Sequence, residues 1–176
     1  MNIRTARLLL RPYRQEDLAD FHEIFSDPAV MRFCGAPYGA RASERQLAWF
    51  IAHPVALAAE EMAEGRMIGH LLFKQLPGEA AGVYEIGWFF NRRYWRRGYA
   101  FEAARALMDE GFRSMGLHKI VAETIDPLAS VRLMEKLGMR REGVFRLHAR
   151  DPRGEWADVY WYAALRPDGA ALPLDG

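Results

Sequence analysis

Apolar and polar residues alternate along this chain with two periods, one typical of helices and one typical of strands. Apolar residues recur three or four positions apart in four segments, which predicts helices at 17–25, 43–51, 98–115 and 126–137. Shorter apolar or alternating runs predict seven strands, at 8–12, 55–60, 67–75, 83–90, 119–125, 140–149 and 156–165. A run of strands followed by interleaved helices and strands indicates an α+β fold with one mixed sheet.

Turn residues and helix caps mark several of these boundaries. A loop rich in glycine and proline is expected at 33–42. The sequence SERQ, which begins at Ser43, fits a capping box for the second helix. Gly116 and Gly138 are suited to end the third and fourth helices, and Asp126-Pro127 is suited to begin the fourth.

Composition limits the class of protein. The 176 residues are 51% hydrophobic and carry a formal net charge of +1, which favours a folded domain over a disordered chain or a generally basic nucleic-acid-binding protein. We expect a single domain at 1–166 and a loosely ordered tail at 167–176. The chain has one cysteine, Cys34, no signal-peptide pattern and no apolar run near the length of about eighteen residues that a spanning helix needs. A cytoplasmic protein without a membrane partner is therefore expected.

The start of the third helix is unusual in its chemistry. The segment YWRRGYAFEAARALM, from Tyr94 to Met108, places arginines and a glycine directly before an amphipathic helix. The first N–H groups of a helix lack partners and carry partial positive charge, and Gly98 and Ala100 leave that backbone uncovered. Arg96 and Arg97, with Arg92 and Arg93 upstream, would add cationic groups. These residues alone fit either an anion site or an ordinary surface helix.

Four segments together resemble the GNAT N-acetyltransferase superfamily, in the branch typified by the ribosomal-protein acetyltransferases RimJ and RimL. They are TARLLLRPYRQEDLADFHEIFSDPAV, YEIGWFFNRRYWRRGYAFEA, ASVRLMEKLGMRREGVFR and GEWADVYWYAAL, which together span about 4–165. Trp95 occupies the position where many relatives have Gln or Arg. The resemblance implies a twisted, mostly antiparallel mixed sheet with flanking helices, and acetyl transfer from acetyl-CoA to a primary amine.

The resemblance also implies where acetyl-CoA binds. The residues of the helix start would hold the pyrophosphate, mostly through backbone N–H groups: Arg96, Arg97, Gly98, Tyr99 and Ala100. The main chain of the preceding strand would hold the pantetheine arm, at Trp88, Phe89 and Phe90. The aromatic side chains of that strand are equally suited to the core, so only their backbone is expected to bind.

Two side chains are candidate catalytic groups. Glu85 interrupts an apolar strand and would accept a proton if it is desolvated, although it is equally suited to face solvent or to pair with an arginine. Ser130 matches a serine of the family that hydrogen-bonds towards the CoA sulfur, or it is simply a serine of a first helical turn. Two departures from the family pattern matter, since Pro127 replaces an asparagine and Met134 replaces a tyrosine that serves relatives as general acid.

The acceptor amine is the open question. A protein α-amine is substantially neutral near pH 7, whereas a lysine amine with a pKa of about 10.4 is not, so an N-terminal substrate tolerates a weak base. The alternatives are a small amine, such as an antibiotic, polyamine or amino-acid derivative, and a CoA-binding domain without activity. Scattered histidines give no support for a metal, and NRRYWRR is weak support for nucleic acid at this net charge. A monomer and a homodimer remain equally open.

Overall fold

The computed structural model describes residues 1–166, so the tail expected at 167–176 lies outside the described residues. The helices are α1 (Leu18–Phe25), α2 (Ala40–Ala52), α3 (Tyr99–Arg113) and α4 (Ala129–Lys136), and short 3-10 turns span Gln15–Asp17 and Arg92–Tyr94. The strands are β1 (Ile3–Arg4), β2 (Leu8–Arg11), β3 (Ala56–Glu61), β4 (Arg66–Gln75), β5 (Val83–Phe90), β6 (Lys119–Thr124), β7 (Arg140–Arg150) and β8 (Trp156–Leu165). The four expected helices and seven expected strands are all present, and β1 is an addition.

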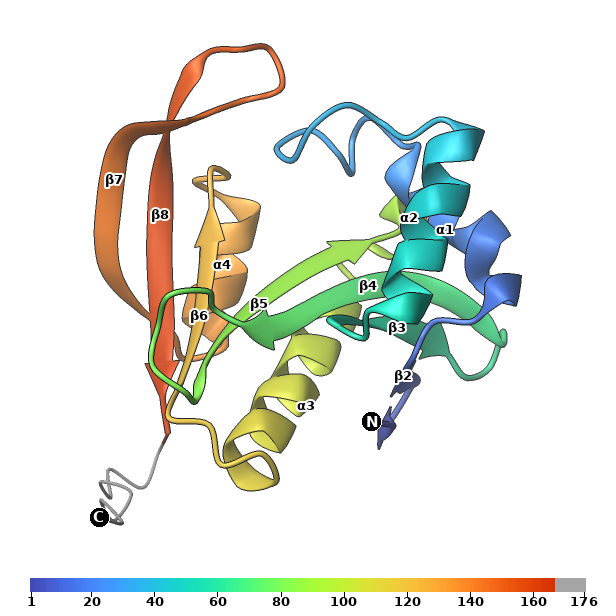
Figure 1. Ribbon diagram of the computed structural model, residues 1–176, viewed down its shortest axis with the longest axis horizontal. Helices are drawn as coiled ribbons and strands as arrows, with labels where there is room; N and C mark the ends of the chain where they lie inside the picture. Colours follow the sequence, from blue (N-terminus) through green and yellow to red (C-terminus); the bar gives the residue numbers. More distant parts are fainter. Residues whose placement is uncertain (167–176) are drawn as a thin grey trace.

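The strands form one eight-stranded sheet in the order β1-β2-β3-β4-β5-β6-β8-β7 (Figure 1). Every neighbouring pair is antiparallel except β5 and β6, which are parallel because α3 connects them. The predicted α+β class with a mixed, mostly antiparallel sheet is therefore confirmed. The sheet is strongly twisted, so its β7–β8 end stands away from its β2–β4 end (Figure 1).

The helices cover the two faces of the sheet unequally. On one face, α3 and α4 pack on the main core, which contains Leu107, Ile120 and Met134, each almost fully buried. On the other face, α1 and α2 cover only the β2–β4 half, around Phe21 and Leu47. Figure 1 shows that this second face is left uncovered by helices at β6, β8 and the first part of β5, whereas Phe89 near the end of β5 packs against Phe25 of α1.

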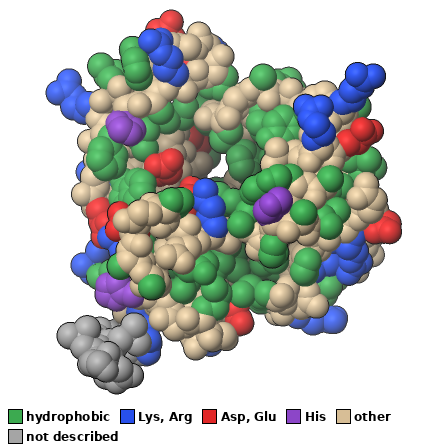
Figure 2. All heavy atoms as spheres, viewed as in Figure 1, with side chains coloured by type: hydrophobic (Ala, Val, Ile, Leu, Met, Phe, Trp, Pro, Cys, Tyr) green, Lys and Arg blue, Asp and Glu red, His purple; other side chains and the backbone are tan. Residues whose placement is uncertain are grey.

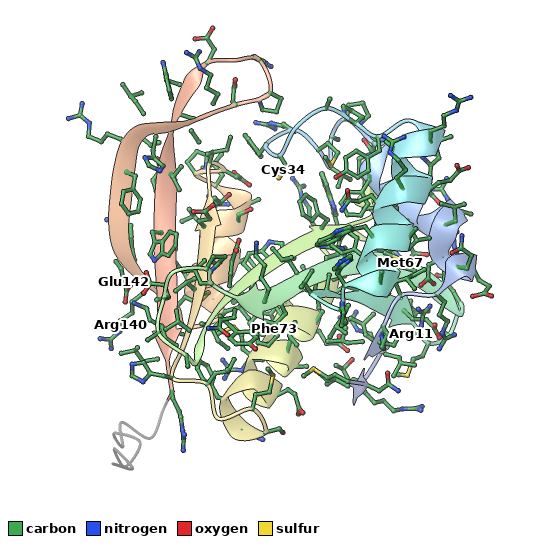
Figure 3. The ribbon with its side chains drawn as sticks, in the orientation of Figure 1. Arg11, Cys34, Met67, Phe73, Arg140 and Glu142 are labelled. Carbon is green, nitrogen blue, oxygen red and sulfur yellow. The ribbon has the colours of Figure 1, made fainter. Side chains whose placement is uncertain are left out.

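Helix α3 approaches the sheet closely at Gly111. A Cβ atom there would lie 3.0 Å from the ring of Phe73 and 3.0 Å from Leu117, a tighter contact than most Cβ atoms make, so these side chains would have to shift. Phe73 lies where β4 passes over α3 (Figure 3). The close contact fixes the position of α3 against the strands that precede and follow it, and thereby the position of the helix start.

The capping box predicted at Ser43 is wrong. Helix α2 begins one turn earlier, at Ala40, and its N-cap residue is Gly39, whose carbonyl accepts the N–H of Ser43. Ser43 lies inside the helix and is fully buried, and its Oγ is 2.9 Å from Nδ1 of His22 on α1. The hydroxyl therefore joins the two helices instead of capping one of them.

Candidate active site

Strands β5 and β6 separate along their length. They pair only between Val83–Glu85 and Lys119–Val121, while β6 stays paired with β8 up to Thr124. From Ile86 onward, within the described residues, β5 has a hydrogen-bonded neighbour only on its β4 side. The result is a V-shaped opening that begins in the middle of the sheet and widens towards the start of α3 (Figure 1).

The main chain of β5 presents alternate residues to this opening. The N–H of Leu76 donates to the carbonyl of Val83, and the N–H of Asn91 donates to the carbonyl of Ile68. Since N–H and C=O groups of successive strand residues point to opposite edges, the odd-numbered residues of β5 face β4. Trp88 and Phe90 then face the opening, whereas the main-chain groups of Phe89 are directed to β4.

Trp95 closes the end of this strand. Its indole N–H donates to the carbonyl of Phe90 at 2.7 Å, although the side chain is 43% exposed. This hydrogen bond uses one of the two lone pairs of the Phe90 carbonyl oxygen. It also stabilises the turn between residues 90 and 95. From the sequence, Trp95 was only a departure from the family pattern, so this role was missed.

The start of α3 has the backbone of an anion site. Arg96 has φ of 61° and Gly98 has φ of 82°, so two left-handed residues lie within three positions. Alternation of this kind turns successive N–H groups towards one point and forms a concave anion site. Gly98 is the N-cap residue of α3, and no side chain of the described residues caps the helix there. The unpaired N–H groups of the first turn therefore remain available to a ligand.

The four arginines around this turn differ in whether a carboxylate pairs with them. Arg92 forms an ion pair with Asp27 at 3.0 Å, and Arg93 forms one with Glu23 at 3.3 Å. The expectation that both add free cationic groups to the site is thus wrong, because the carboxylates of Glu23 on α1 and of Asp27, two residues after that helix, pair with them. Arg96 and Arg97 are exposed and form no ion pair among the described residues. These two remain as the cations of the candidate anion site.

Tyr99 and Ala100 contribute backbone instead of side chain. The Tyr99 ring is buried and makes an edge contact with Tyr94 at a centroid distance of 5.8 Å. Ala100 is half-buried against the main core. The side chains of both residues therefore belong to the core, and the expectation that their N–H groups hold a ligand stays a prediction.

Glu85 lies on the uncovered face of the sheet, opposite α3. Its carboxylate is 3.3 Å from the ammonium of Lys74, the residue directly across on β4. The Glu85 side chain is 19% exposed to solvent. Of the possibilities left open by the sequence, the structure has an ion pair, although with Lys74 instead of an arginine, and the carboxylate is still partly accessible from the uncovered face.

Glu123 on β6 is a second carboxylate on the same face. It lies two residues beyond Val121, the parallel partner of Glu85, and opposite Trp161 on β8. Partial desolvation and the nearby charge of Glu85 raise the pKa of the Glu123 carboxyl above its ordinary value. The segment KIVAETI shows the same signal that identified Glu85, an isolated carboxylate in an apolar strand, but the sequence analysis did not use it.

Ser130 lies in the first turn of α4, beside the end of β6. The carboxylate of Asp126 accepts the N–H groups of Leu128 and Ala129, at 2.9 and 3.2 Å. The predicted N-cap position is nevertheless wrong by two residues, because α4 begins at Ala129 and its N-cap residue is Leu128. The hydroxyl of Ser130 is 3.4 Å from the same carboxylate, a weak contact that leaves it free to turn elsewhere. Met134 is fully buried, so the position where relatives have a general acid is here part of the core.

Above the uncovered face, the β7–β8 hairpin and the segment before α2 stand apart, and Figure 2 shows a hollow between them. The hairpin carries exposed apolar side chains, including Phe145 and Trp156, which are 46% and 53% exposed. Cys34 lies on the opposite side of the hollow (Figure 3). Asp158 accepts the N–H of Leu147 at 2.8 Å, so it supports the hairpin backbone.

None of the helices in the described part of the chain is long and apolar enough to span a membrane. Among the same residues, no group of three His, Cys, Asp or Glu side chains is arranged to hold a metal ion.

Comparison with known proteins agrees with this geometry. The family model described as an acetyltransferase (GNAT) domain matches residues 7–140. An uncharacterized N-acetyltransferase of Bacillus subtilis, YnaD, is 40% identical over 96% of this chain and 99% of its own length. A GNAT-family acetyltransferase from Bacillus anthracis superposes with a TM-score of 0.87 at 36% identity, over 94% of this chain and 99% of that one. The ribosomal L7/L12 acetyltransferase RimL, solved with coenzyme A, shares the fold with a TM-score of 0.79 at 18% identity, over 94% of this chain and 98% of that one.

Proposed function

Since this chain belongs to the GNAT family of N-acetyltransferases, we propose that it transfers the acetyl group of acetyl-CoA to the α-amine of a polypeptide N-terminus. The amine nitrogen attacks the thioester carbonyl, so that an N–C bond forms and the C–S bond breaks. The amine gives up a proton to a base, and the CoA thiolate takes one up. The reaction occurs in one complex of enzyme, donor and acceptor.

The donor has a place along the V-shaped opening. The pyrophosphate binds the N–H groups of the left-handed turn from Arg96 to Gly98 and of the first turn of α3, with Arg96 and Arg97 as counter-charges. The pantetheine arm runs beside β5 and hydrogen-bonds the main chain of Trp88 and the N–H of Phe90. The thioester then lies where β5 and β6 part, close to the uncovered face that carries Glu85.

The Lys74–Glu85 ion pair is the observation that favours an α-amine. Because the Glu85 carboxylate is already engaged by the Lys74 ammonium group at 3.3 Å, the site suits an acceptor that arrives largely neutral and needs little help from a base. An α-amine with a pKa of about 7.7–8.0 meets that condition, whereas only about one lysine amine in a thousand is neutral near pH 7. Glu85 takes the proton directly or through a water molecule, and Ser130 is placed to donate to the thiolate.

The hollow beside the hairpin supports the same acceptor. It is bordered by exposed apolar side chains, and an extended peptide can enter between the hairpin and the segment before α2 (Figure 2). The single cysteine is consistent with a reducing compartment, so we place the reaction in the cytoplasm.

A small cationic amine is the second candidate, and one observation favours it. Glu85 and Glu123 lie on the same face, and the charge of one raises the pKa of the other. A cationic acceptor would relieve that repulsion on binding, as polyamines and aminoglycosides do at acidic sites.

A direct assay separates the candidates. The purified chain is incubated with acetyl-CoA and matched peptides, one with a free α-amine and no lysine, the other with a blocked N-terminus and one lysine. Polyamines and aminoglycosides form a second panel, and mass spectrometry locates the acetyl group. We expect acetylation of the free α-amine only. Transfer to a polyamine while every peptide fails would replace the α-amine by the small-amine function, and no transfer despite CoA binding would indicate an inactive domain.

A further inference from the structure

The turn between β1 and β2 is bound to the first turn of α3, about a hundred residues away in the sequence. The carboxylate of Glu102 makes this connection. Glu102 lies one turn inside the helix, and its main-chain N–H donates to the carbonyl of Gly98 at 3.0 Å. Oε1 of Glu102 accepts the hydroxyl of Thr5 at 2.6 Å and the main-chain N–H of Arg7 at 2.9 Å. Oε2 accepts a hydrogen bond from Nε of Arg7 at 2.7 Å and forms an ion pair with Nη2 of Arg7 at 2.6 Å.

The same guanidinium also contacts the anion turn itself. Nη1 of Arg7 donates to the carbonyl of Arg97 at 3.0 Å, between the two left-handed residues of the turn. The guanidinium carbon lies 4.1 Å from the centroid of the Tyr99 ring, and Nη2 is 3.6 Å from where a Cβ of Gly98 would be. Arg7 therefore touches three successive residues of the turn and the helix start that follows it.

Two physical reasons make this contact matter for an anion. A left-handed conformation at Arg96 is costly for a residue with a side chain, so it persists only when the surroundings hold it in place. A carboxylate one turn inside α3 would also repel a phosphate at the helix start, unless a cation neutralises it. The hydrogen bonds from Thr5 and Arg7, and the charge of Arg7, hold the pKa of the Glu102 carboxyl below its ordinary value even though desolvation acts against them. Glu102 therefore stays ionised and paired.

We propose that Arg7 and Glu102 are positioning residues for the donor. Together they hold the Arg96–Gly98 turn in the conformation that directs its N–H groups at the pyrophosphate, and Arg7 cancels the charge that Glu102 brings to the helix start. The proposal rests on the proposed placement of acetyl-CoA and adds to it Arg7 of the β1–β2 turn and Glu102 of α3. Affinity for the donor is then set partly by a contact at the N-terminal end of the chain.

Calorimetric titration with CoA tests this with Arg7→Met, Glu102→Gln and the double variant. We expect each single variant to weaken CoA binding by about 10-fold or more, the usual effect of losing a charge-assisted hydrogen bond. The double variant should be no weaker than the worse single one, since both act through one contact. In assays, KM for acetyl-CoA should rise while kcat at saturating donor and KM for the acceptor stay unchanged.

Three controls keep the result specific. Arg4→Met removes a neighbouring cation in the groove beside α3, where Arg4 forms no ion pair among the described residues, and should leave CoA affinity unchanged. Thr5→Val removes one hydrogen bond to Glu102 but not the Arg7–Arg97 bond, so it should lower stability more than affinity. Hydrogen exchange at 96–99 in the unliganded protein should increase in Arg7→Met, a readout that needs no CoA.

Other outcomes overturn the proposal in distinct ways. If Glu102→Gln binds CoA more tightly while Arg7→Met binds it more weakly, Arg7 acts as a direct cation for the ligand and not through the turn. A loss in Arg7→Met that disappears with dephospho-CoA would have the same meaning, with the 3′-phosphate as its target. Unchanged affinity and unchanged exchange in both single variants would remove the role altogether. Failure of the wild type to bind CoA, with slow exchange at 96–99, would instead contradict the proposed function.

Discussion

The indole N–H of Trp95 donates a 2.7 Å hydrogen bond to the main-chain carbonyl of Phe90. This bond joins the last residue of β5 to the residue before the left-handed turn, so it sets the distance between the two parts of the proposed donor site. It also decides which main-chain groups of β5 remain for pantetheine, since that carbonyl already has one partner.

Replacing Trp95 by phenylalanine keeps an aromatic ring and removes the donor. We expect KM for acetyl-CoA to rise by about 3- to 10-fold, the usual effect of one neutral hydrogen bond, with little change in kcat. The control is Trp156→Phe. Trp156 is an exposed residue of the β7–β8 hairpin, and its indole ring contacts the guanidinium group of Arg150. Equal donor KM values in the two variants would contradict the role assigned to Trp95.

Gly98→Ala tests the anion turn, and Gly116→Ala is its matched control. Both glycines are left-handed, with φ of 82° and 64°, and neither substitution meets protein atoms closer than 3.6 Å. Each should therefore lower the free energy of unfolding by about 1–2 kcal/mol, measured in urea. Only Gly98→Ala should also weaken CoA binding, because only this glycine belongs to the turn proposed to hold the pyrophosphate, and its methyl group would lie 3.6 Å from Nη2 of Arg7. Normal CoA affinity in that variant would show that the pyrophosphate binds elsewhere.

Glu85→Gln tests the proton acceptor. With an α-amine peptide at pH 7, we expect kcat/KM to fall by about 10²-fold, the low end for a positioned general base. The deficit should shrink towards pH 9, where the acceptor amine is already neutral. Steady-state rates between pH 6 and 9 measure this. A rate that does not change at any pH would transfer the role to Glu123 or to water.

The titration of Glu123 gives an independent check on the geometry. The charge of Glu85 is one of the causes that raise the pKa of the Glu123 carboxyl, so that pKa should fall in Glu85→Gln. Because the folded-state pKa is raised, ionisation of Glu123 costs stability as pH rises through that pKa. Glu123→Gln should accordingly be at least as stable as the wild type at pH 7. Carboxyl-detected NMR follows the first effect and urea unfolding follows the second.

The buried imidazole of His70 should make the free energy of unfolding depend on pH. Burial lowers the pKa of its imidazole from 6.5 to about 3, and its Nδ1 lies 2.5 Å from the hydroxyl of Tyr13. A depressed folded-state pKa means that the stability is fully present above pH 6.5 and is lost as pH falls towards 3. The free energy of unfolding should thus drop by about 2 kcal/mol between pH 7 and 5. His70→Gln should lose that dependence, whereas the exposed control His53→Gln should keep it; equal slopes would disprove the assignment.

The sequence was sufficient for the elements and for the glycine-containing turn that precedes α3. Strand and helix periods come from neighbouring residues, so the expected segments were found to within a few positions. The turn around Gly98 was identifiable for the same reason, since glycine, arginines and the helix that follows are contiguous. Asp126 likewise accepts N–H groups from residues only two to four positions away, at the start of α4.

Partners that lie far apart in the sequence were decided only by the tertiary structure. Ser43 fits a capping box locally, yet its hydroxyl meets His22 on another helix. Arg92 and Arg93 look like cations of the anion site, yet the fold brings Glu23 on α1 and Asp27 just after that helix to them.

The chain by itself therefore determined the fold, the family and the anion turn, because local pattern and contiguous motifs encode them. Folding decided which arginines are free of ion pairs and whether Glu85 is paired. It also decided that Arg7 contacts the turn and Glu102. An ion pair depends on the distance between two side chains, and only the packed sheet brings residues 95 positions apart to within 2.7 Å.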